Sequence, residues 1–253
     1  MEKLSVVIIT YNEESAIERC IASVKNVADE VLVVDSNSTD KTKEICLRLG
    51  ARFYEHTFEG YIQQKNYAIS LASFDYILML DADEALSETL SDSILRAKQV
   101  FDRDGYNMNR MTNYCGSWMK HGNFYPDRKL RLWDRRKGEW GGRNPHDHVN
   151  MQPNSKVGHL KGDILHYSII TLEGNITQFN KFTTIAAQEL FSENRKISAI
   201  GVFVKGFAAF FKSFFMKRGF LDGYYGIALS VITSFATFMK YMKLRELNRN
   251  AKV

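Results

Sequence analysis

The stretch EVLVVD, residues 30–35, decides the fold, because it is apolar from its second residue until it ends at Asp35. Comparable runs lie on both sides of it, LSVVIIT at residues 4–10 and YILML at residues 76–80, and segments with helical spacing separate them. Strands that are apolar without alternation are buried on both faces, which is typical of parallel sheets covered by helices. We therefore predict an α/β fold with a mostly parallel sheet flanked by helices.

Three regions differ in the structure that they predict. Residues 1–105 alternate between strand and helix patterns, and residues 106–171 are rich in aromatic and basic side chains, which favours an irregular α+β segment of the same domain. Within that segment Leu130 and Leu132 alternate with basic residues, as in an edge strand. Residues 172–253 have helical spacing throughout, so we predict a helical C-terminal region.

The composition is that of a folded protein without a disulfide framework. The chain has 253 residues, of which 45% are hydrophobic, and its 3 cysteines lack CxxC spacing. The N-terminal apolar run is too short for a signal peptide, so we expect a cytoplasmic protein. A net charge of +5 and a pI near 9.0 are compatible with nucleic acid, anionic lipid or phosphorylated small molecules as partners.

Two aspartates, Asp81 and Asp83, follow the apolar run at residues 76–80. Side chains two residues apart on a strand point to the same side, so the two carboxylates would repel each other without a cation between them. Hard carboxylate oxygens suit Mg²⁺ or Mn²⁺, and a diphosphate can complete the coordination. The sequence therefore predicts a metal-assisted nucleotide site, with a solvated loop cap as the alternative.

Further polar residues follow the other predicted strands, at the edge where parallel sheets bind their ligands. Thr10 and Asn12 follow the first run, and Asp35 ends the second, where its carboxylate can accept hydrogen bonds from a base or a ribose. Lys65, in the segment QQKN, is predicted to reach the phosphates as a point charge. The alternative for Lys65 is a solvated charge on a helix.

Four segments, VIITYNEE, VVDSNSTDKT, QQKNYA and LMLDADEA, resemble in order and spacing the inverting nucleotide-sugar glycosyltransferases of glycosyltransferase family 2. The later segments YPDRKLRLWDRR, GDILHYS and FLDGYYG resemble the bacterial branch that glycosylates the lipopolysaccharide core. The resemblance implies a GT-A fold, a DxD motif and metal-dependent transfer of glucose or another hexose from a UDP-sugar. It also implies a lipid-linked saccharide, such as the lipopolysaccharide inner core, as the acceptor.

The resemblance also implies roles for single residues. Asp35 would contact the nucleobase, Asp81 the ribose, and Asp83 the metal that bridges the diphosphate of the donor. Many members of the family have an acidic residue where this chain has Ser36. The nucleotide-binding set predicted in this way is Thr10, Tyr11, Asn12, Glu13, Asp35, Ser36, Lys65 and Asp81.

Inverting transfer is a single in-line displacement and requires a carboxylate that removes the acceptor proton. Asp147, in the segment GGRNPHDHVN, is the predicted base, and Asp127 is the second choice. The alternative is that Asp147 caps a turn. His166 is predicted to complete the metal shell or contact the diphosphate, with a packed core histidine as the alternative. A zinc site at His146 and His148 is not predicted, because no further ligand lies at a recognisable spacing.

A basic and aromatic set in the middle region is predicted to bind a phosphorylated saccharide by stacking and ion pairing. The alternative is a solvated basic rim. No nucleic-acid-binding module accompanies the set, so we do not expect nucleic acid as a partner. The set comprises Arg110, Lys120, Arg128, Arg131, Arg135, Arg136, Tyr114, Trp118, Trp133 and Trp140.

The C-terminal region predicts contact with a membrane. Residues 200–215 place phenylalanines and other apolar side chains at helical spacing, with Lys205 and Lys212 on the opposite side. Residues 223–239 are uncharged, but serine and threonine interrupt them, and they are not predicted to span a bilayer. We expect a peripheral protein on the anionic inner face of the cytoplasmic membrane, with a helix that covers the sheet as the alternative.

Two other functions stay open from the sequence alone. A polyprenyl phosphate is an alternative acceptor, and its reacting oxygen is already ionised, so that reaction needs no general base. A membrane-associated scaffold that binds nucleotide-sugars without transferring them is an alternative of another class.

Overall fold

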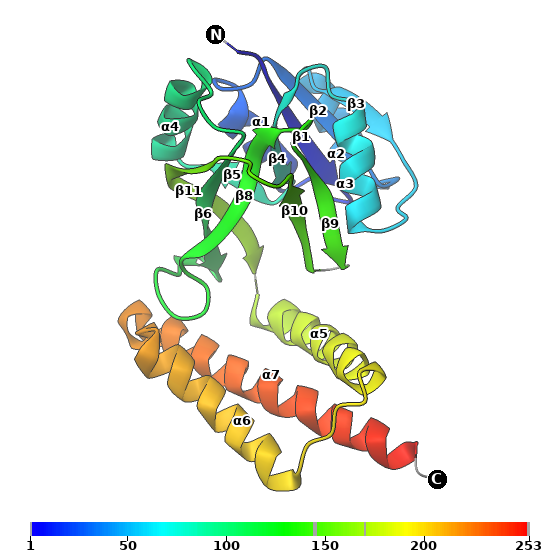
Figure 1. The fold of residues 1–253 in the computed structure, drawn as a ribbon, viewed down its shortest axis with the longest axis vertical. Helices are drawn as coiled ribbons and strands as arrows, with labels where there is room; N and C mark the ends of the chain where they lie inside the picture. The colour runs from blue at the N-terminus through cyan, green and yellow to red at the C-terminus, as the bar shows by residue number, and fades with distance from the viewer. Residues whose placement is uncertain (1, 144–145, 170, 252–253) are drawn as a thin grey trace. The chain divides into compact units, whose positions relative to one another are not determined.

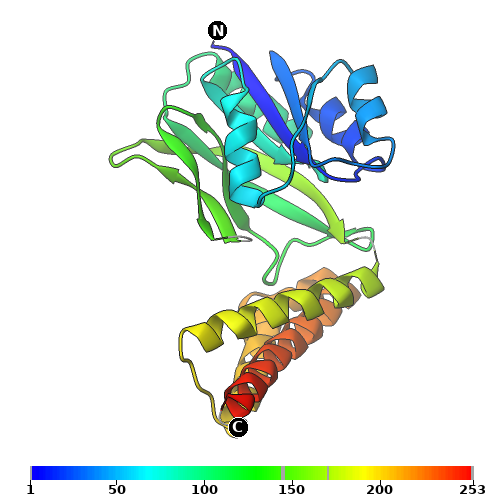
Figure 2. The ribbon, with the colours of Figure 1, turned by 90° about the vertical axis from the view of Figure 1, so that its right-hand side faces the viewer.

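The structure of the chain is a computed structural model that describes residues 2–143, 146–169 and 171–251. The chain forms two compact units (Figures 1 and 2). Unit 1 comprises residues 1–110 and 127–166, and unit 2 comprises residues 111–126 and 167–253. The chain therefore leaves unit 1, returns to it and leaves it again. The region boundaries after residues 105 and 171 that the sequence suggests stay a prediction.

Four parallel strands form the first part of the sheet, in the order β3-β2-β1-β4 (Figure 1). Their bounds are Leu4–Thr10 for β1, Glu30–Asp35 for β2, Arg52–Glu55 for β3 and Tyr76–Asp81 for β4. Every residue of β1 is buried, because both faces of the strand are covered. Thr10 pairs with Asp35, and Ile9 pairs with Asp81. The carboxyl ends of β1, β2 and β4 therefore lie side by side, as predicted.

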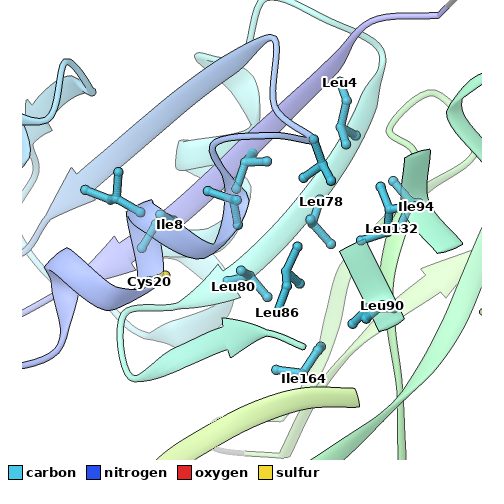
Figure 3. Close-up of a cluster of buried hydrophobic side chains, with 14 of the residues drawn as sticks. Leu4, Ile8, Cys20, Leu78, Leu80, Leu86, Leu90, Ile94, Leu132 and Ile164 are labelled. Atoms are coloured by element: carbon cyan, nitrogen blue, oxygen red, sulfur yellow. The ribbon is translucent and has the colours of Figure 1, made fainter. Parts of the chain in front are cut away.

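Helices cover both faces of this sheet. Their bounds are Ile17–Val24 for α1, Thr42–Arg48 for α2, Tyr61–Ser70 for α3 and Glu88–Lys98 for α4. Leu4 and Ile8 point to the face where α1, α2 and α4 pack (Figure 3). Val6 belongs to the same cluster, because alternate strand residues share a face. Val7 and Ile9 point to the opposite face, where α3 packs. The predicted α/β fold is confirmed.

The sheet continues beyond β4 in the order β8-β6-β11-β5, and β8 pairs antiparallel with both β4 and β6. The bounds are Glu84–Leu86 for β5, Gly105–Tyr114 for β6, Ser117–Trp118 for β7, Asp127–Asp134 for β8 and Val157–Ile169 for β11. The prediction of an edge strand at Leu130 and Leu132 is wrong, because β8 lies inside the sheet. Leu132 enters the core, while Arg131 is buried, at 3% exposure, among carboxylates.

A β-hairpin packs on the α3 side of the sheet through Trp140. Its strands are β9 at Gly138–Arg143 and β10 at His146–Met151. The side chain of Asn150 lies over Gly141, where a Cβ would be 2.1 Å from Asn150 Nδ2. The segment predicted as a loop around Asp147 is therefore mostly strand, and residues 144–145 within it lie outside the described part of the chain.

Three long helices form most of unit 2 (Figures 1 and 2). They are α5 at Leu172–Ser192, α6 at Ala199–Phe211 and α7 at Gly223–Asn250, and α7 packs against the other two. A π-helix at Lys212–Met216 and a 3₁₀ helix at Gly219–Asp222 form the turn between α6 and α7. The inserted segment 111–126 belongs to this unit, since Tyr114 and Met119 cluster with Leu229 of α7.

The helix predicted over residues 200–215 is observed as α6 and the π-helix that follows it. Ser198 caps it, because its Oγ accepts a hydrogen bond from Gly201 N at 3.0 Å. Much of its apolar face is exposed, with 65% of Phe203 and 71% of Phe207 accessible to solvent. Among the described residues, Ala199–Met216 and Gly219–Asn250 are long and apolar enough to cross a membrane, judged by length and composition alone.

Candidate active site

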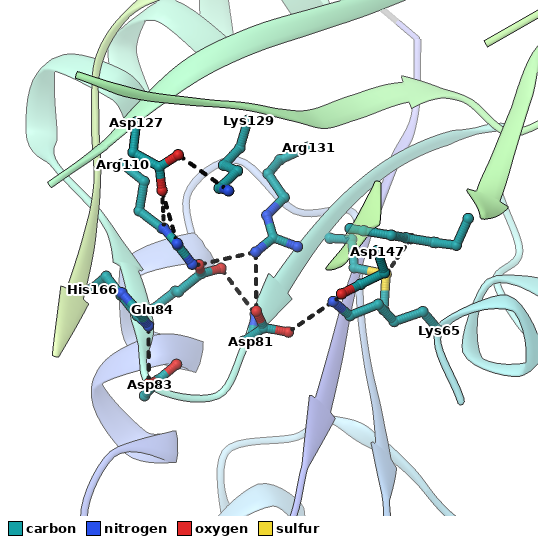
Figure 4. Close-up of polar contacts among 12 residues, drawn as sticks. Lys65, Asp81, Asp83, Glu84, Arg110, Asp127, Lys129, Arg131, Asp147 and His166 are labelled. Atoms are coloured by element: carbon teal, nitrogen blue, oxygen red, sulfur yellow. Dashed lines mark hydrogen bonds and ion pairs between the residues drawn. The ribbon is translucent and has the colours of Figure 1, made fainter. Parts of the chain in front are cut away.

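The carboxyl end of β4 gathers charged side chains of unit 1 (Figure 4). Asp81 is the last residue of β4, and its Oδ2 accepts a hydrogen bond from Arg131 Nη2 at 3.0 Å. Its Oδ1 lies 3.6 Å from Lys65 Nζ. Burial raises the pKa of Asp81, but the charges of Arg131 and Lys65 outweigh burial and hold that pKa well below its ordinary range. Asp81 is therefore ionised at physiological pH.

Glu84 is the buried centre of a charge cluster that the sequence did not predict. Its side chain is 0% exposed, and Oε1 accepts hydrogen bonds from Arg131 Nη2 at 3.0 Å and Arg110 Nη1 at 3.3 Å. Its Oε2 accepts the backbone N–H of Asp81 at 3.0 Å, which fixes the end of β4. Arg110 also binds Asp127 at 2.8 Å. Asp127, the second choice for the base, is therefore held in an ion pair. The only sequence signal for Glu84 is a third acidic residue directly after Asp83.

Arg131 carries unused hydrogen-bond donors at this site. Its Nε and Nη1 are buried, and neither has a hydrogen-bond partner among the described residues. Buried donors are normally satisfied, so these two nitrogens suit an oxygen-rich ligand. The sequence placed Arg131 in the acceptor-binding set, whereas the structure places it beside Asp81 in the predicted nucleotide site.

The predicted base and the predicted phosphate-binding lysine form an ion pair. Lys65 Nζ lies 2.6 Å from Asp147 Oδ2 and is only 5% exposed at its side chain. The same ammonium group lies 4.2 Å from the centroid of the Trp140 ring, a cation–π contact that holds it in place. Lys65 therefore lies between Asp147 and Asp81, which come from different elements of the fold.

Asp83 and His166, the two predicted metal ligands, lie together. Asp83 Oδ2 is 3.2 Å from His166 Nε2. Adjacent ligands of an octahedral ion with bonds of about 2.1 Å lie about 3 Å apart, so the two atoms fit neighbouring positions around Mg²⁺ or Mn²⁺.

Two further observations show how well Asp83 and His166 suit a metal ion. No cluster of three or more His, Cys, Asp or Glu side chains suited to a metal is found in the described part of the chain, so a diphosphate and water would have to supply the other ligands. The Nδ1 of His166 is buried and has no hydrogen-bond partner within residues 2–143, 146–169 and 171–251, whereas a metal-bound histidine usually donates a hydrogen bond through its second nitrogen. Asp83 therefore fits a metal better than His166 does.

The loops that follow β1 and β2 are tied together by the predicted nucleotide-binding residues. Asp35 is 1% exposed, and its Oδ2 accepts the backbone N–H of Ser38 at 2.7 Å. The hydroxyl of Ser38 accepts the backbone N–H of Asn12 at 2.7 Å, and Asn12 Oδ1 accepts that of Thr39 at 2.8 Å. Asp35 and Asn12 thus shape this edge of the sheet, and their contact with a base or ribose stays a prediction.

The remaining residues of the predicted nucleotide set differ in their surroundings. Thr10 Oγ1 is buried and has no partner among the described residues, while Tyr11 exposes 59% of its surface and offers an open aromatic face. Ser36 accepts a hydrogen bond from α3 at 3.1 Å. Burial, followed by the nearby carboxylate of Asp83, raises the pKa of Glu13 to about 7. Glu13 is therefore partly protonated near neutral pH.

The basic and aromatic set predicted to bind the acceptor does not form one surface. Trp133 and Trp140 are 0% and 5% exposed, because their rings fill the core between the sheet and the β9–β10 hairpin. The prediction that they stack on sugars is wrong. Tyr114, Trp118 and Lys120 belong to unit 2, and Arg136 is bound to Asp134 and Asp75.

Carboxylates, a lysine and an arginine thus gather at the carboxyl ends of the parallel strands, where open α/β sheets bind their ligands. The fold and the site therefore define an α/β protein with a charged ligand-binding edge. Residues 5–157 match the model of the family described as Glycosyl transferase family 2, and the chain belongs to that family. The resemblance seen in the sequence motifs is thus confirmed.

Several known proteins are similar to this chain. An uncharacterised glycosyltransferase of Rickettsia typhi is 34% identical over 263 residues, which cover 100% of this chain and 90% of that protein. The lipopolysaccharide core biosynthesis glycosyltransferase LpsC of Rhizobium meliloti is 30% identical over 193 residues, 74% of this chain and 71% of that protein. Among solved structures, glucosyl-3-phosphoglycerate synthase of Mycobacterium tuberculosis has a TM-score of 0.38 and 22% identity over 44% of each chain.

Proposed function

We propose that the protein is an inverting glycosyltransferase that moves a hexose, with glucose as the first choice, from a UDP-sugar to a lipid-linked saccharide such as the lipopolysaccharide inner core. The observation that carries the proposal is the position of Lys65, whose ammonium group lies between Asp147 and Asp81. One side chain, that of Lys65, therefore contacts both the predicted catalytic base and the predicted nucleotide site. The similarity to LpsC, named for lipopolysaccharide core biosynthesis, supports the choice of acceptor.

In the proposed reaction the oxygen of an acceptor hydroxyl forms a bond to C1 of the donor sugar. The bond from C1 to the diphosphate oxygen breaks at the same time, and the diphosphate leaves with the bonding electrons. Asp147 takes the hydroxyl proton through Oδ1, because Oδ2 is bound to Lys65. Lys65 and Nη1 of Arg131, which has no hydrogen-bond partner among the residues that the structure describes, stabilise the negative charge that develops on the diphosphate. Asp35 orients the nucleobase of the donor, and Asp81 orients its ribose.

A divalent cation, Mg²⁺ or Mn²⁺, is proposed to bind at Asp83, with His166 as a second ligand. The 3.2 Å separation of their facing atoms supports this assignment. When bound, such a cation neutralises charge on the diphosphate.

The second unit is proposed to hold the enzyme on the inner face of the cytoplasmic membrane as a peripheral protein. The exposed phenylalanines of α6 and the two long apolar segments support this location. A lipid-linked acceptor lies at the same surface, so the location and the acceptor are consistent with each other.

Calorimetric titration of a panel of nucleotide-sugars tests the donor site. One UDP-sugar is expected to bind in the presence of Mn²⁺, and to bind about tenfold or more weakly after Asp83→Ala or without Mn²⁺. Asp92→Ala is the control, because Asp92 is an exposed carboxylate on α4, outside the site. Binding that is indifferent to both Asp83 and Mn²⁺, or no binding of any nucleotide-sugar, would contradict the proposal.

Asp147→Asn tests the base. Asparagine keeps the shape of the side chain but cannot take a proton, so turnover on a saccharide hydroxyl is expected to fall about 10²–10⁴-fold. Because the change also weakens the ion pair with Lys65, the donor affinity of the variant is measured as well and is expected to stay near that of the wild type. Turnover close to the wild-type rate would rule out Asp147 as the base.

One observation favours a second candidate function. Asp147 is held 2.6 Å from Lys65, and transfer to a polyprenyl phosphate needs no base because the acceptor oxygen is already ionised. An enzyme of that kind retains most of its activity after Asp147→Asn when polyprenyl phosphate is the acceptor. Metal-dependent donor binding without turnover on any acceptor would instead favour the non-catalytic scaffold.

A further inference from the structure

Unit 2 contains a cavity that has no part in the proposed sugar transfer. Its volume is about 270 Å³, and it is lined by the inserted segment 111–126 and by the turn between α6 and α7. The polar side chains at its walls include Lys120, His121, Tyr125, Lys217 and Arg218. Two distant parts of the sequence therefore build one basic cavity.

Hydrogen bonds fix the two walls of the cavity to each other. The backbone N–H groups of Lys120 and His121 donate to the carboxylate of Asp222 at 3.1 and 2.8 Å. The Nδ1 of His121 lies 2.7 Å from the same carboxylate. Gly122 N donates to the carbonyl oxygen of Lys217 at 2.9 Å. The cavity is therefore held in shape by direct contacts between its walls.

Close packing holds the turn between α6 and α7 in one conformation. A Cβ on Gly226 would lie 1.9 Å from the carbonyl oxygen of Gly219, and a Cβ on Gly219 would lie 2.8 Å from that of Ser213. The hydroxyl groups of Ser213 and Ser230 share a buried hydrogen bond of 3.1 Å. The two basic residues of the turn thus project from a rigid backbone, which lowers the entropy lost when they bind a ligand.

Three basic side chains of the cavity face one carboxylate, that of Asp222, so a net positive charge remains. In the described part of the chain, no ion pair involves Lys120, Lys217 or Arg218. Asp222, the carboxylate at the wall, is 6% exposed and already accepts hydrogen bonds from His121 and from two backbone N–H groups. A phosphate group supplies both the negative charge and the acceptor oxygens that three such cations can bind.

Large apolar side chains of the same turn and of the first turn of α7 are exposed to solvent. The exposed fractions are 51% for Phe215, 70% for Met216, 44% for Phe220, 54% for Leu221 and 74% for Tyr224. Aromatic and apolar side chains beside basic ones suit the interface of an anionic bilayer, where the rings enter the headgroup region and the cations meet phosphates. A soluble phosphate would leave this apolar surface in water, so the occupant that fits both features is a lipid.

We propose that this cavity binds the phosphate of an anionic phospholipid headgroup and thereby attaches unit 2 to the bilayer. The inference rests on the proposed membrane location and not on sugar transfer. It adds to that location a ligand group and the residues that bind it, namely Lys120, Lys217 and Arg218.

Sedimentation with lipid vesicles tests this proposal on the full-length protein. Vesicles of phosphatidylcholine are compared with vesicles that also contain about 30% phosphatidylglycerol, which supplies the anionic surface. The cavity variant combines Lys217→Gln with Arg218→Asn, since asparagine tolerates the φ of 56° at residue 218. A basic residue near an anionic surface contributes about fivefold to binding, so this variant is expected to bind anionic vesicles about 25-fold more weakly. Lys120→Gln, on the other wall, is expected to weaken binding about fivefold.

The matched control combines Lys181→Gln with Lys196→Gln, two exposed lysines of unit 2 that are not among the residues lining the cavity. It removes the same charge and is expected to change binding less than about twofold. An equal loss in the control and in the cavity variant would mean that the attraction is diffuse, and the proposal would be wrong. Equal binding of the wild type to neutral and anionic vesicles would also overturn it.

Calorimetric titration with glycerol phosphate separates a lipid from a soluble ligand. Glycerol phosphate carries the headgroup phosphate without the acyl chains, and the protein is expected to bind it far more weakly than it binds anionic vesicles. Tight binding of glycerol phosphate that the cavity variant loses, together with no sedimentation on anionic vesicles, would identify a soluble phosphate as the occupant and overturn the lipid assignment. Circular dichroism of each variant shows that the helices of unit 2 are folded. Since neither this control nor vesicle binding requires donor or metal, the outcome is independent of whether sugar transfer is correct.

Discussion

Replacing Glu84 by glutamine tests how strongly the buried charge cluster stabilises unit 1. The carboxylate is 0% exposed and faces two guanidinium groups, at 3.0 Å from Arg131 Nη2 and 3.3 Å from Arg110 Nη1. Glutamine keeps the shape of the side chain and can still accept a hydrogen bond. It removes the charge opposite Arg131, whose side chain is only 4% exposed and cannot be solvated instead.

We expect Glu84→Gln to lower the free energy of unfolding by about 3 kcal/mol. Removing one partner of a buried ion pair costs about 3–5 kcal/mol. The lower end applies here, because Asp81 still faces Arg131 and Arg110 still binds Asp127. With a urea m-value of about 2 kcal/mol/M, the midpoint of unfolding is expected to fall by about 1.5 M.

Urea unfolding followed by tryptophan fluorescence measures this change, because Trp133 and Trp140 are both buried in unit 1. Glu55→Gln is the control. It removes an ion pair with Lys43 in which the side chains are 51% and 54% exposed, and it is expected to cost less than about 1 kcal/mol. If Glu84→Gln costs no more than this control, the cluster does not stabilise the end of β4 and the reasoning is refuted.

Two further predictions concern stability. Gly226→Ala places a Cβ 1.9 Å from the carbonyl oxygen of Gly219 and is expected to cost about 3 kcal/mol, whereas Gly174→Ala, whose Cβ would lie 3.1 Å from the hydroxyl of Thr171, is expected to cost less than about 1 kcal/mol. Equal losses in chemical unfolding would argue against the close packing of the turn. Glu13 has its pKa raised from 4.5 to about 7, chiefly by burial, so its ionisation opposes folding and stability falls as the pH rises through that window. Thermal unfolding of Glu13→Gln is expected to match the wild type near pH 4.5 and to have a higher midpoint at pH 8; a pH-independent difference would contradict the assignment.

The parallel part of the fold was predictable, because continuously apolar runs such as LSVVIIT can be buried only in a sheet that is covered on both faces. Strand β8 was not. The alternation of leucine with lysine and arginine along it is the same for an edge strand and for an inner strand that faces a charge cluster. The partners that distinguish the two cases, Glu84 and Asp81, lie 47 and 50 residues away from Arg131 in the sequence.

Single polar residues at the strand ends could be picked out from local motifs, but the contacts between them could not. Lys65 and Asp147 were each predicted from local motifs, yet they are 82 residues apart and no periodic pattern reports that they form an ion pair. The role of Glu84 was not predicted, because an acidic residue after a strand end has the same local pattern as a solvated cap. In the structure Glu84 is buried between two arginines and is the centre of the cluster. Local sequence patterns do not show which charged residues pair when they lie far apart in the chain.

Unit 2 is made of two separate segments of the chain, so during synthesis its first segment is made long before the helices that it packs against. Tyr114 and Met119 pack against Leu229, and the segment that carries them is tied to Asp222, about 100 residues further along the chain. At a synthesis rate of about 5–20 residues per second, that segment waits about 5–20 s for its partner helix. During this interval its aromatic side chains are available to chaperones and proteases. A nascent chain arrested before α7 is therefore expected to be degraded even though it already contains every strand of the sheet.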